Sequence, residues 1–338
     1  MTTIYDIAKR TGYSPTTVSK AFNNYSDVRA KTREEILRTA REMGYLPNAH
    51  ARTLTTKKSW TLGVLFVEGT GVGIRHPFFG AVIESFKQVA VAKGYALMFI
   101  SKDVGGKQSG YLENCRIHGI DGVVVFLSDY EDPYFLELLD SDIPTVILDY
   151  ETEQSHTVCS DNMAGAMLAV EYLTSLGHSR IAHISGGTNT VPGSQREKGY
   201  AVAMKQQGHE LRENYIVEGA FYALENGYAA MQKLLELPDR PTAVFASGDL
   251  LALGAVMAAK DSGLSVPGDI SVMGYDDIEL ARYVTPALTT VRQDTASLGT
   301  RAAEILLASI DRKGTGMEAI VLPVEVVVRE SCAPPGKV

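Results

Sequence analysis

The sequence predicts a mixed α/β protein with a small all-α helix-turn-helix head, a hinge, and two doubly wound parallel-sheet subdomains. Three observations lead to this fold class. Apolar residues repeat at helical spacing within the first 45 residues. From residue 60 onward, apolar strand-like runs alternate with helical ones, which is the pattern of parallel sheets covered by helices on both faces. This series occurs twice, so two subdomains with a cleft between them are expected within the 338 residues.

The first two helices of the head are predicted within the opening twenty-odd residues. Apolar residues recur at helical spacing over 4–8, and Gly12 ends the run. Ser14 is a good N-cap and Pro15 suits the first helical position, so a second helix is expected to begin there. A helix-turn-helix presents short polar side chains and a cation from its second helix to base edges, and this helix offers Thr16, Thr17, Ser19, Lys20 and Asn23. A helical hairpin without a ligand is the alternative.

A third helix is predicted between residues 25 and 45. Thr32 is expected to cap it, Glu35 stands at the capping-box spacing, and Gly44 ends it. Residues 47–59 follow as a hinge with a short helix and a polar linker. This stretch carries too little apolar surface to fold alone, so it is either flexible or ordered by a partner.

The remainder of the chain is expected to form the two subdomains. Strand-like runs lie at residues 62–67, 96–100, 122–127, 144–148 and 157–159, and then at 180–185, 215–218, 242–246 and 270–274. Helical periodicity is present at 79–92, 165–176, 193–206 and 250–261. A last helix (298–310) and a strand-rich tail (319–329) are expected to cross back between the subdomains. The predicted boundaries are 1–46 for the head, 47–59 for the hinge, 60–159 with 292–321 for the first subdomain, and 160–291 with 322–330 for the second.

The charge of the chain is unevenly distributed. The net charge is −8, but residues 1–58 hold 11 Lys and Arg against 5 Asp and Glu, a net of +6. The remaining residues hold 21 against 35, a net of −14. A small basic segment on an acidic body is typical of a protein whose basic part binds nucleic acid.

Cysteine usage and hydropathy indicate the compartment. The three cysteines lie far apart without metal-ligand spacing, so they are expected to be reduced packing residues, and no metal is expected. The N-terminus shows no basic-then-apolar leader, and no apolar run approaches about 18 residues. A cytoplasmic protein that is neither exported nor membrane-spanning is expected.

Short motifs along nearly the whole chain resemble the LacI/GalR (lactose-repressor) family of bacterial transcription regulators. The head and hinge carry them at residues 4–8, 17–19, 31–33, 44–48 and 51–52, and the core carries them at 175–178, 196–200, 241–243, 274–277 and 286–291. The resemblance implies two core subdomains of periplasmic-binding-protein-like type and a sequence-specific DNA-binding head.

For DNA, the resemblance implies contacts from the head and hinge. Lys20 would donate to a guanine edge, without the bidentate fork of the arginine more usual there. Pro15 and Thr16 replace bulkier readers, so the operator sequence of the best-known member is not assumed. Leu54 matches a minor-groove wedge, with an ordinary linker leucine as the alternative. The implied DNA-binding set is Thr3, Tyr5, Ser14, Pro15, Thr16, Thr17, Ser19, Lys20, Asn23, Asn48, Ala51 and Leu54.

For the cleft, the resemblance implies an effector site made of His76, Phe78, Asp149, Arg196, Phe221, Asp249, Asp276 and Gln293. An arginine between carboxylates suits a neutral polyol, because carboxylates accept from adjacent hydroxyl groups and the arginine donates to their oxygens. The alternatives are a structural Arg–Asp pair, Phe78 and its neighbour Phe79 as core residues, and Asp249 as a helix cap. Gly248 stands where sugar-responsive members often carry Asn, which suits a ligand that is larger, differently oriented or not a simple monosaccharide.

The predicted function is therefore a homodimeric, effector-controlled repressor that binds a pseudo-palindromic operator, with a sugar as the expected effector. Alternatives are the same regulator with a nucleobase or a protein corepressor, and a cytoplasmic ligand-binding protein without specific DNA binding. An enzyme is not expected, because no Ser-His-Asp order, zinc spacing or phosphate loop is present, and no cofactor is expected. The glycine-rich loop at 69–73 lacks the third glycine of a dinucleotide fingerprint. No leucine heptad occurs near the C-terminal end of the sequence, which argues against a coiled-coil tetramer.

Overall fold

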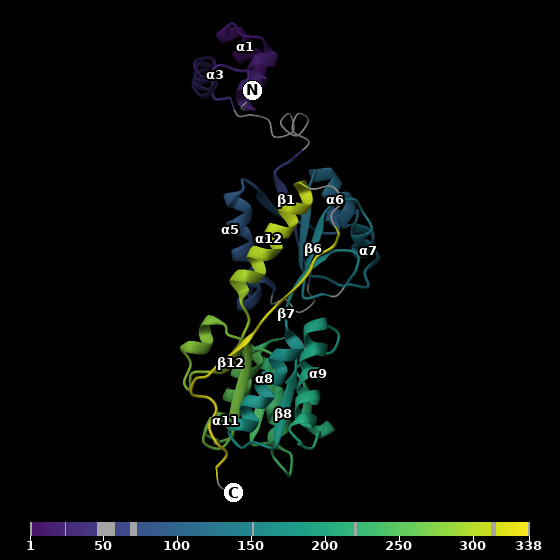
Figure 1. The fold of residues 1–338 in the computed structure, drawn as a ribbon, viewed down its shortest axis with the longest axis vertical. Helices are drawn as coiled ribbons and strands as arrows, with labels where there is room; N and C mark the ends of the chain where they lie inside the picture. The colour runs from purple at the N-terminus through teal and green to yellow at the C-terminus, as the bar shows by residue number, and fades with distance from the viewer. Residues whose placement is uncertain are drawn as a thin grey trace. The chain divides into compact units, whose positions relative to one another are not determined.

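The computed structural model describes residues 2–23, 25–45, 58–67, 73–150, 152–219, 222–311 and 316–336 (Figure 1). The chain divides into two compact units, Met1–Thr61 with Gly119–Asp121, and Leu62–His118 with Gly122–Val338. Within the described residues, no helix combines the length and apolar character needed to cross a membrane.

The head is made of three helices, α1 (Ile4–Thr11), α2 (Pro15–Phe22) and α3 (Ala30–Glu42). Thr3 caps α1 in a reciprocal capping box with Asp6, and Gly12 ends it with a φ of 77°. The predicted start of α2 is confirmed, since the Ser14 hydroxyl accepts from the Thr17 amide and Pro15 is the first helical residue. The helices bury a small apolar core of Ile7, Ala8, Val18, Ala21, Val28, Ile36 and Ala40.

The predicted cap of the third helix is wrong. The helix begins at Ala30, so Thr32 already lies in the first turn, and no side chain caps the preceding Arg29. A local contact holds the turn before the helix and accompanies the earlier start: the Arg33 guanidinium donates to the carbonyls of Tyr25 and Val28. Glu35 accepts from the Tyr13 hydroxyl (3.1 Å) instead of closing a capping box.

The segment after the hinge is fixed by an aspartate of the same unit. The Asp121 carboxylate accepts from the backbone N–H groups of Ser59 and Trp60, both at 2.8 Å. The Lys58 ammonium lies 5.6 Å from the centre of the Trp60 ring. Two charge-assisted hydrogen bonds on consecutive amides orient the chain where β1 begins.

The second unit contains two six-stranded sheets. The first lobe is built on a sheet of order β13-β7-β6-β5-β1-β2. Its strands are β1 (Thr61–Phe66), β2 (Ala96–Phe99), β5 (Gly122–Leu127), β6 (Thr145–Leu148), β7 (His156–Ser160) and β13 (Ala319–Leu322). Its helices are η1 (Gly73–Arg75), α5 (Pro77–Ala92), α6 (Tyr111–His118), α7 (Pro133–Leu139) and α12 (Thr295–Asp311), and a separate hairpin joins β3 (Asp103–Val104) to β4 (Lys107–Gln108).

The second lobe is built on a sheet of order β14-β12-β11-β10-β8-β9, in which only β14 pairs antiparallel among the described strands. Its strands are β8 (Ile181–Ser185), β9 (Ile216–Glu218), β10 (Ala243–Ala246), β11 (Ser271–Asp276), β12 (Thr289–Arg292) and β14 (Glu325–Val327). Its helices are α8 (Asn162–Ser175), α9 (Val191–Gln206), η2 (Glu213–Tyr215), α10 (Leu224–Leu235), α11 (Asp249–Asp261) and η3 (Glu279–Arg282).

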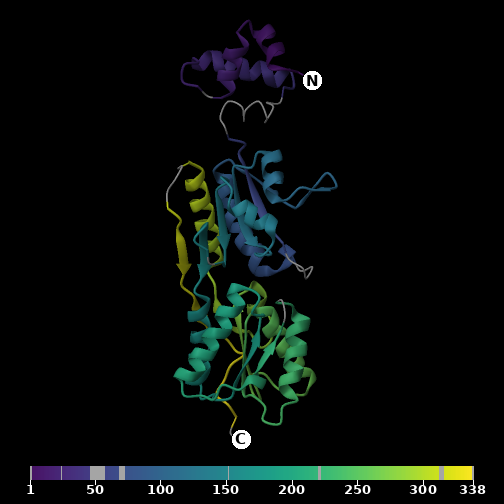
Figure 2. The same cartoon turned by 90° about the vertical axis from the view of Figure 1, so that its right-hand side faces the viewer.

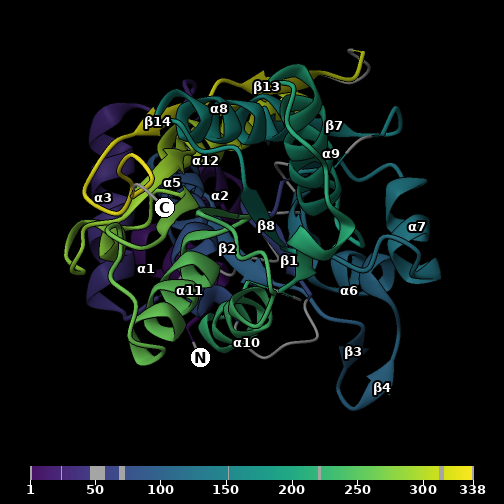
Figure 3. The ribbon, with the colours of Figure 1, turned by 90° about the horizontal axis from the view of Figure 1, so that it is seen from below.

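Helices cover both faces of the second sheet. Helices α8 and α9 lie on one face and α10 and α11 on the other, each pair over its own apolar cluster (Figure 3). Helices α10 and α11 approach closely, because a Cβ at Gly254 would stand 2.0 Å from the Leu224 carbonyl oxygen. These layers confirm the predicted doubly wound α/β fold.

Three chain crossings connect the lobes (Figure 2). The first runs from β7 to α8, the second from β12 to α12, and the third from β13 to β14. The predicted strand-rich tail is thus two strands in different sheets, separated by Pro323. Five other predicted bounds differ by more than a residue. Strand β11 extends to Asp276, and the helices α5, α8, α9 and α12 each begin two or three residues earlier than predicted, with Asp161 as the cap of α8.

Candidate effector site and nucleic-acid interface

Two aspartates at strand ends and one helical arginine form the centre of the candidate site. Asp149 follows β6 in the first lobe, Asp276 ends β11 in the second, and Arg196 lies on α9. Both aspartates have positive φ, 50° and 119°, a conformation that L-residues other than glycine seldom adopt. Such backbone geometry is found mainly where a site requires it, and ligands of doubly wound folds bind at the carboxyl ends of the strands.

Arg196 is 3% exposed and is held from several sides. Its Nε donates to Asn162 Oδ1 (2.8 Å) and its Nη1 to the Ser247 carbonyl (2.6 Å). The guanidinium carbon lies 3.8 Å from the centre of the Tyr275 ring, a cation–π geometry. Its Nη1 is 3.8 Å from Asp276 Oδ1, so the charges attract without a close bond between them.

Asp276 in this centre and Asp249 behind it differ in role. Asp276 accepts from Gln293 Nε2 (2.7 Å), and burial raises the pKa of Asp276 to about 6 although Arg196 opposes the rise. Asp249 is completely buried and accepts from the Ile278 amide (2.8 Å) and the Thr290 hydroxyl (2.5 Å). Burial and then the nearby Asp276 raise the pKa of Asp249. With both oxygens engaged within the protein, Asp249 supports the site from behind.

The alternative role for Asp249 as a helix cap is wrong. Asp249 is the first residue of α11, and Gly248 occupies the N-cap position. A Cβ at Gly248 would lie 2.7 Å from the Tyr222 ring, so this glycine leaves room for an aromatic side chain. The tyrosine ring therefore fills the space beside the backbone position where related regulators are expected to carry Asn.

Several buried polar atoms around Arg196 have no hydrogen-bond partner among the described residues. They are both ring nitrogens of His76, Oδ1 of Asp149 and Oε1 of Gln293. Native structures leave very few such atoms, so a cluster of them indicates a site whose partners come from outside the chain. Burial, and next the charge of Arg196, lower the pKa of His76 to about 4, so its ring is neutral at pH 7 and offers one donor and one acceptor.

The small cavity beside this centre is mainly aromatic and lies between the lobes. It has a volume of about 30 Å³ and is lined by Phe79, Phe126, Leu127, Tyr130, Asp149, Thr190, Pro192 and Tyr222. That volume holds about one water molecule. A sugar or a nucleobase would therefore enter only if the walls move apart.

The structure places the remaining predicted effector residues as follows. Phe78 is buried with its ring 5.3 Å from that of Phe79, and Phe79 rather than Phe78 lines the cavity. Phe221 lies outside the described residues, and its neighbour Tyr222 lines the cavity instead. Five of the predicted residues lie together in the structure: His76, Asp149, Arg196, Asp276 and Gln293. Their role in effector binding stays a prediction.

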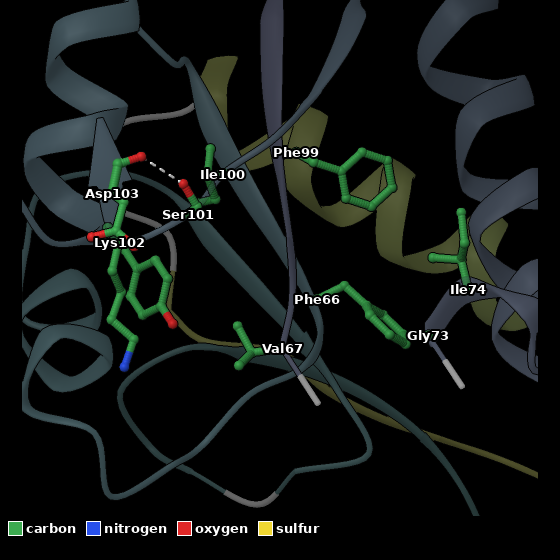
Figure 4. Close-up of a pocket in the computed structure, with 10 residues that line it drawn as sticks. Phe66, Val67, Gly73, Ile74, Phe99, Ile100, Ser101, Lys102 and Asp103 are labelled. Carbon is green, nitrogen blue, oxygen red and sulfur yellow. Dashed lines mark hydrogen bonds between the residues drawn. The ribbon is translucent and has the colours of Figure 1, made fainter. Parts of the chain in front are cut away.

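A second hollow, of about 560 Å³, lies in the first lobe at the ends of β1 and β2. Phe66, Ile74 and Phe99 gather on one side of it, and Lys102 lies on the other (Figure 4). The Lys102 ammonium is already paired with Asp132 at 2.5 Å. None of its ten lining residues carries a buried polar atom without a partner of the kind found around Arg196, so the candidate site is placed at Arg196 and not in this hollow.

In the head, some of the side chains predicted to contact DNA are exposed, and others form hydrogen bonds within the head. Tyr5, Ser14 and Thr16 are exposed, whereas Val18 and Ala21 on the opposite face of α2 are buried. Hydrogen bonds within the head hold four of the predicted side chains: Thr3 and Ser14 in caps, Thr17 to Ser14, and Asn23 to the Ser19 carbonyl. Pro15, Thr17, Ser19 and Asn23 are half-buried on α2 and its end, and Asn48, Ala51 and Leu54 lie outside the described residues.

Lys20 has a partner that the sequence did not indicate. Its ammonium lies 2.5 Å from the Asp27 carboxylate, and this hydrogen bond raises the pKa of Lys20. Three residues of the candidate effector site were also missed, Asn162, Tyr222 and Tyr275. Only Tyr275 had a signal in the sequence, because it directly precedes Asp276 at the end of an apolar strand, where ligands of doubly wound folds bind.

Comparison with known proteins gives two family matches. Residues 3–48 match the family of bacterial regulatory proteins, lacI family, and residues 170–332 match a periplasmic binding protein-like domain. A relative from Erwinia tasmaniensis, the HTH-type transcriptional repressor PurR, is 38% identical over 98% of this chain and 97% of its own.

Two solved structures are similar over nearly the whole chain. The lac repressor dimer bound to operator and the anti-inducer ONPF has a TM-score of 0.85 at 28% identity, covering 98% of this chain and 99% of that one. A complex of the transcriptional regulator CelR with cellobiose has a TM-score of 0.71 at 30% identity, covering 98% of this chain and all of that one.

Proposed function

Because this chain belongs to the lacI family of bacterial regulatory proteins, and is thus a DNA-binding transcriptional repressor and not an enzyme, we propose that its effector is a neutral carbohydrate bound around Arg196. One observation carries the proposal: buried, unpartnered polar atoms of His76, Asp149 and Gln293 surround a single buried cation.

The inventory of donors and acceptors selects a polyol. Asp149 and Gln293 offer free oxygens that only accept, so the ligand has to donate several hydrogen bonds. Each hydroxyl group of a sugar donates one bond and accepts others, whereas a nucleobase offers few donors and only in its plane. The aromatic walls, among them Phe79 and Tyr222, suit the apolar face of a sugar ring.

The charges of the site select a neutral ligand. Asp149 and Asp276 stand against one cation, Arg196, because His76 is neutral at pH 7. An added carboxylate or phosphate would meet two acidic groups without a second cation, and buried charges without a partner are costly. Sugar acids and sugar phosphates are therefore excluded from the proposed effector class.

At the other end of the chain, we propose that the exposed face of α2 reads the operator. Thr16 is exposed and Lys20 half-buried on this helix, and we expect both to contact base edges or phosphates in a major groove, with Lys20 leaving Asp27 when it does. Two copies of the chain would bind the two halves of a pseudo-palindrome as a homodimer, since two-fold symmetry of the protein imposes the same symmetry on the DNA. The effector acts by differential affinity for the DNA-competent and incompetent states, a coupling of about 1–3 kcal/mol.

A thermal-shift screen tests the effector class. The panel contains ribose and cellobiose as neutral sugars, galacturonate and glucose 6-phosphate as anions, and guanine as a nucleobase. A compound at about a hundred times its Kd stabilises the folded state by about 2.7 kcal/mol and raises Tm by several degrees. We expect a rise with a neutral sugar alone. A rise with guanine or with the anions contradicts the proposal.

Arg196→Ala tests the site itself. We expect this variant to lose the response to a sugar that stabilises the wild type, while its affinity for operator DNA is unchanged. The operator is obtained by selection from random duplexes with the wild-type protein. Loss of both activities would mean that Arg196 is structural, as in the alternative of an Arg–Asp pair.

A further inference from the structure

We propose that His183 is a positioning residue for Arg196, which acts through the backbone of Ser247. Its role is to keep the Arg196 guanidinium from closing onto the Asp276 carboxylate, so that both groups can bond a ligand. The inference rests on the effector role proposed above for Arg196 and Asp276. His183 lies on β8 in the second lobe and is completely buried.

All three polar groups of Ser247 take part in hydrogen bonds. Ser247 directly follows β10, and its backbone N–H donates to the Ile184 carbonyl of β8 at 2.9 Å. Its hydroxyl oxygen lies 3.2 Å from His183 Nε2, and its carbonyl accepts from Arg196 Nη1 at 2.6 Å. Because β8 holds both the N–H and the hydroxyl, the direction of the carbonyl toward Arg196 is fixed.

The second ring nitrogen of His183 sets the polarity of its bond to Ser247. Nδ1 lies 3.0 Å from the Phe245 carbonyl oxygen, which only accepts, so Nδ1 carries the proton. Burial lowers the pKa of His183 to about 4 although the Phe245 carbonyl opposes this change, so the ring is neutral at pH 7. Nε2 is then an acceptor, and the Ser247 hydroxyl donates to it.

The Ser247 carbonyl determines where the Arg196 guanidinium lies. Nη1 bonds this carbonyl and stays 3.8 Å from Asp276 Oδ1, although the two charges attract. If the carbonyl turned away, Nη1 would lose this acceptor and move to the Asp276 carboxylate. A direct pair of this kind would engage the two groups with each other instead of with the hydroxyl groups of a sugar.

Packing of the imidazole ring is the competing explanation, because the ring stacks on those of Tyr200 and Phe245 at centroid distances of 4.9 and 5.0 Å. Two amide substitutions separate the explanations. In His183→Asn, the amide overlays Nδ1, where it donates to the Phe245 carbonyl but does not reach Ser247. In His183→Gln, the amide overlays Nε2, where it accepts from the Ser247 hydroxyl.

Two further variants complete the set. Ser247→Ala removes the hydroxyl that His183 bonds and keeps the backbone carbonyl. His178→Asn is the matched control, because His178 is also a buried histidine of this lobe whose ring bonds hydroxyl groups. Its partners are Thr242 (2.9 Å) and Ser271 (3.1 Å), at the opposite ends of β10 and β11 from the site.

The first measurement needs no ligand. It is the part of the pH dependence of unfolding that Asp276 causes, measured on the full-length protein by urea titrations between pH 4 and 7. Each protein is compared with its own Asp276→Asn counterpart. This difference cancels the titration of His183 itself and of the other titratable groups around Arg196, which are His76, Asp149 and Asp249.

A cation that moves into contact with a carboxylate lowers its pKa by about 1–3. We therefore expect the midpoint of this pH dependence to be lower by about one pH unit or more in His183→Asn and in Ser247→Ala. The double variant should shift it no further than either single one, since both remove the same bond. His183→Gln and His178→Asn should keep the wild-type midpoint. Equal midpoints in His183→Asn and His183→Gln, or a wild-type midpoint in Ser247→Ala, overturn the proposal.

The second measurement is the Kd of ribose or cellobiose, whichever stabilises the wild type. A hydrogen bond to a charged group changes affinity by about tenfold or more, so we expect a loss of that size in His183→Asn and Ser247→Ala but not in His183→Gln. A wild-type Kd in Ser247→Ala overturns the positioning role. If neither sugar binds the wild type, the proposed effector class fails, but the pH measurement still decides the role of His183.

Discussion

Ile36→Ala should strongly weaken operator binding without affecting the two lobes, because the free energy of unfolding of the head is small. Ile36 is completely buried on α3, and the head core contains seven buried apolar residues in all among its described positions. An Ile→Ala change in a core costs about 2–5 kcal/mol. A domain of fewer than about 70 residues rarely gains more than about 3–5 kcal/mol from its core, so the substitution removes most or all of that stability.

The assay is operator binding of the full-length variant at 37 °C, followed by fluorescence anisotropy, beside a thermal melt. We expect operator affinity to fall at least in proportion to the unfolded fraction of the head, and high operator concentration to recover part of the binding by mass action. The melt of the lobes should be unchanged. Ile181→Ala, at a completely buried position of β8, is the matched control and should lower that melt while operator binding persists at 25 °C. Wild-type operator affinity in Ile36→Ala would refute the reasoning.

Three further outcomes are expected. Gly254→Ala should lower Tm, because its Cβ would press on the Leu224 carbonyl and overpacking costs about 1–3 kcal/mol. Gly316→Ala, which has open space around it, is the control and should leave Tm unchanged. Equal Tm values for the two variants would contradict the close contact between α10 and α11. Asp276→Asn should remove part of the pH dependence of the free energy of unfolding. A carboxyl pKa raised to about 6 contributes stability that is present below pH 4 and is lost as pH rises through 6. Urea titrations of both proteins between pH 4 and 7 measure this free energy, and the same pH dependence in both would disprove the prediction. Asp277→Ala should speed proteolysis after residue 322, because the Asp277 carboxylate pairs with Arg292 (2.7 Å) and with Arg329 of the C-terminal segment. Wild-type cleavage rates in this variant would show that Asp277 does not hold the C-terminal segment in place.

Local signals predicted the elements, and non-local contacts explain most of the errors. Ser14 and Pro15 gave the start of α2 correctly, since a cap bonds to amides within the same turn. Thr32 failed as a cap because the helix begins two residues before it, where Arg33 of the same helix holds the preceding turn through the carbonyls of Tyr25 and Val28.

The candidate site shows the same division. Asp149 and Asp276 were found through the family resemblance, which matched residues at the carboxyl ends of two apolar strands; the two strands, β6 and β11, belong to different sheets. Asn162 was not, because its partner Arg196 is 34 residues away on another helix, and no spacing within α8 encodes that distance. The internal bonds of Asp249 to Ile278 and Thr290 depend on strand order, which periodicity alone does not give.

The segment clamped by Asp121 gives this protein a built-in optical probe. Trp60 is the single tryptophan of the chain, while there are 16 tyrosines, so selectively excited indole emission comes from one place. That place is the start of β1, directly after the hinge, where the backbone of Trp60 is fixed by a carboxylate and its ring lies near the Lys58 ammonium. Indole emission responds to nearby charge and to solvent. Titrations with DNA or with the proposed sugar effectors can therefore be followed on the unlabelled protein, from the point in the chain that joins the head to β1.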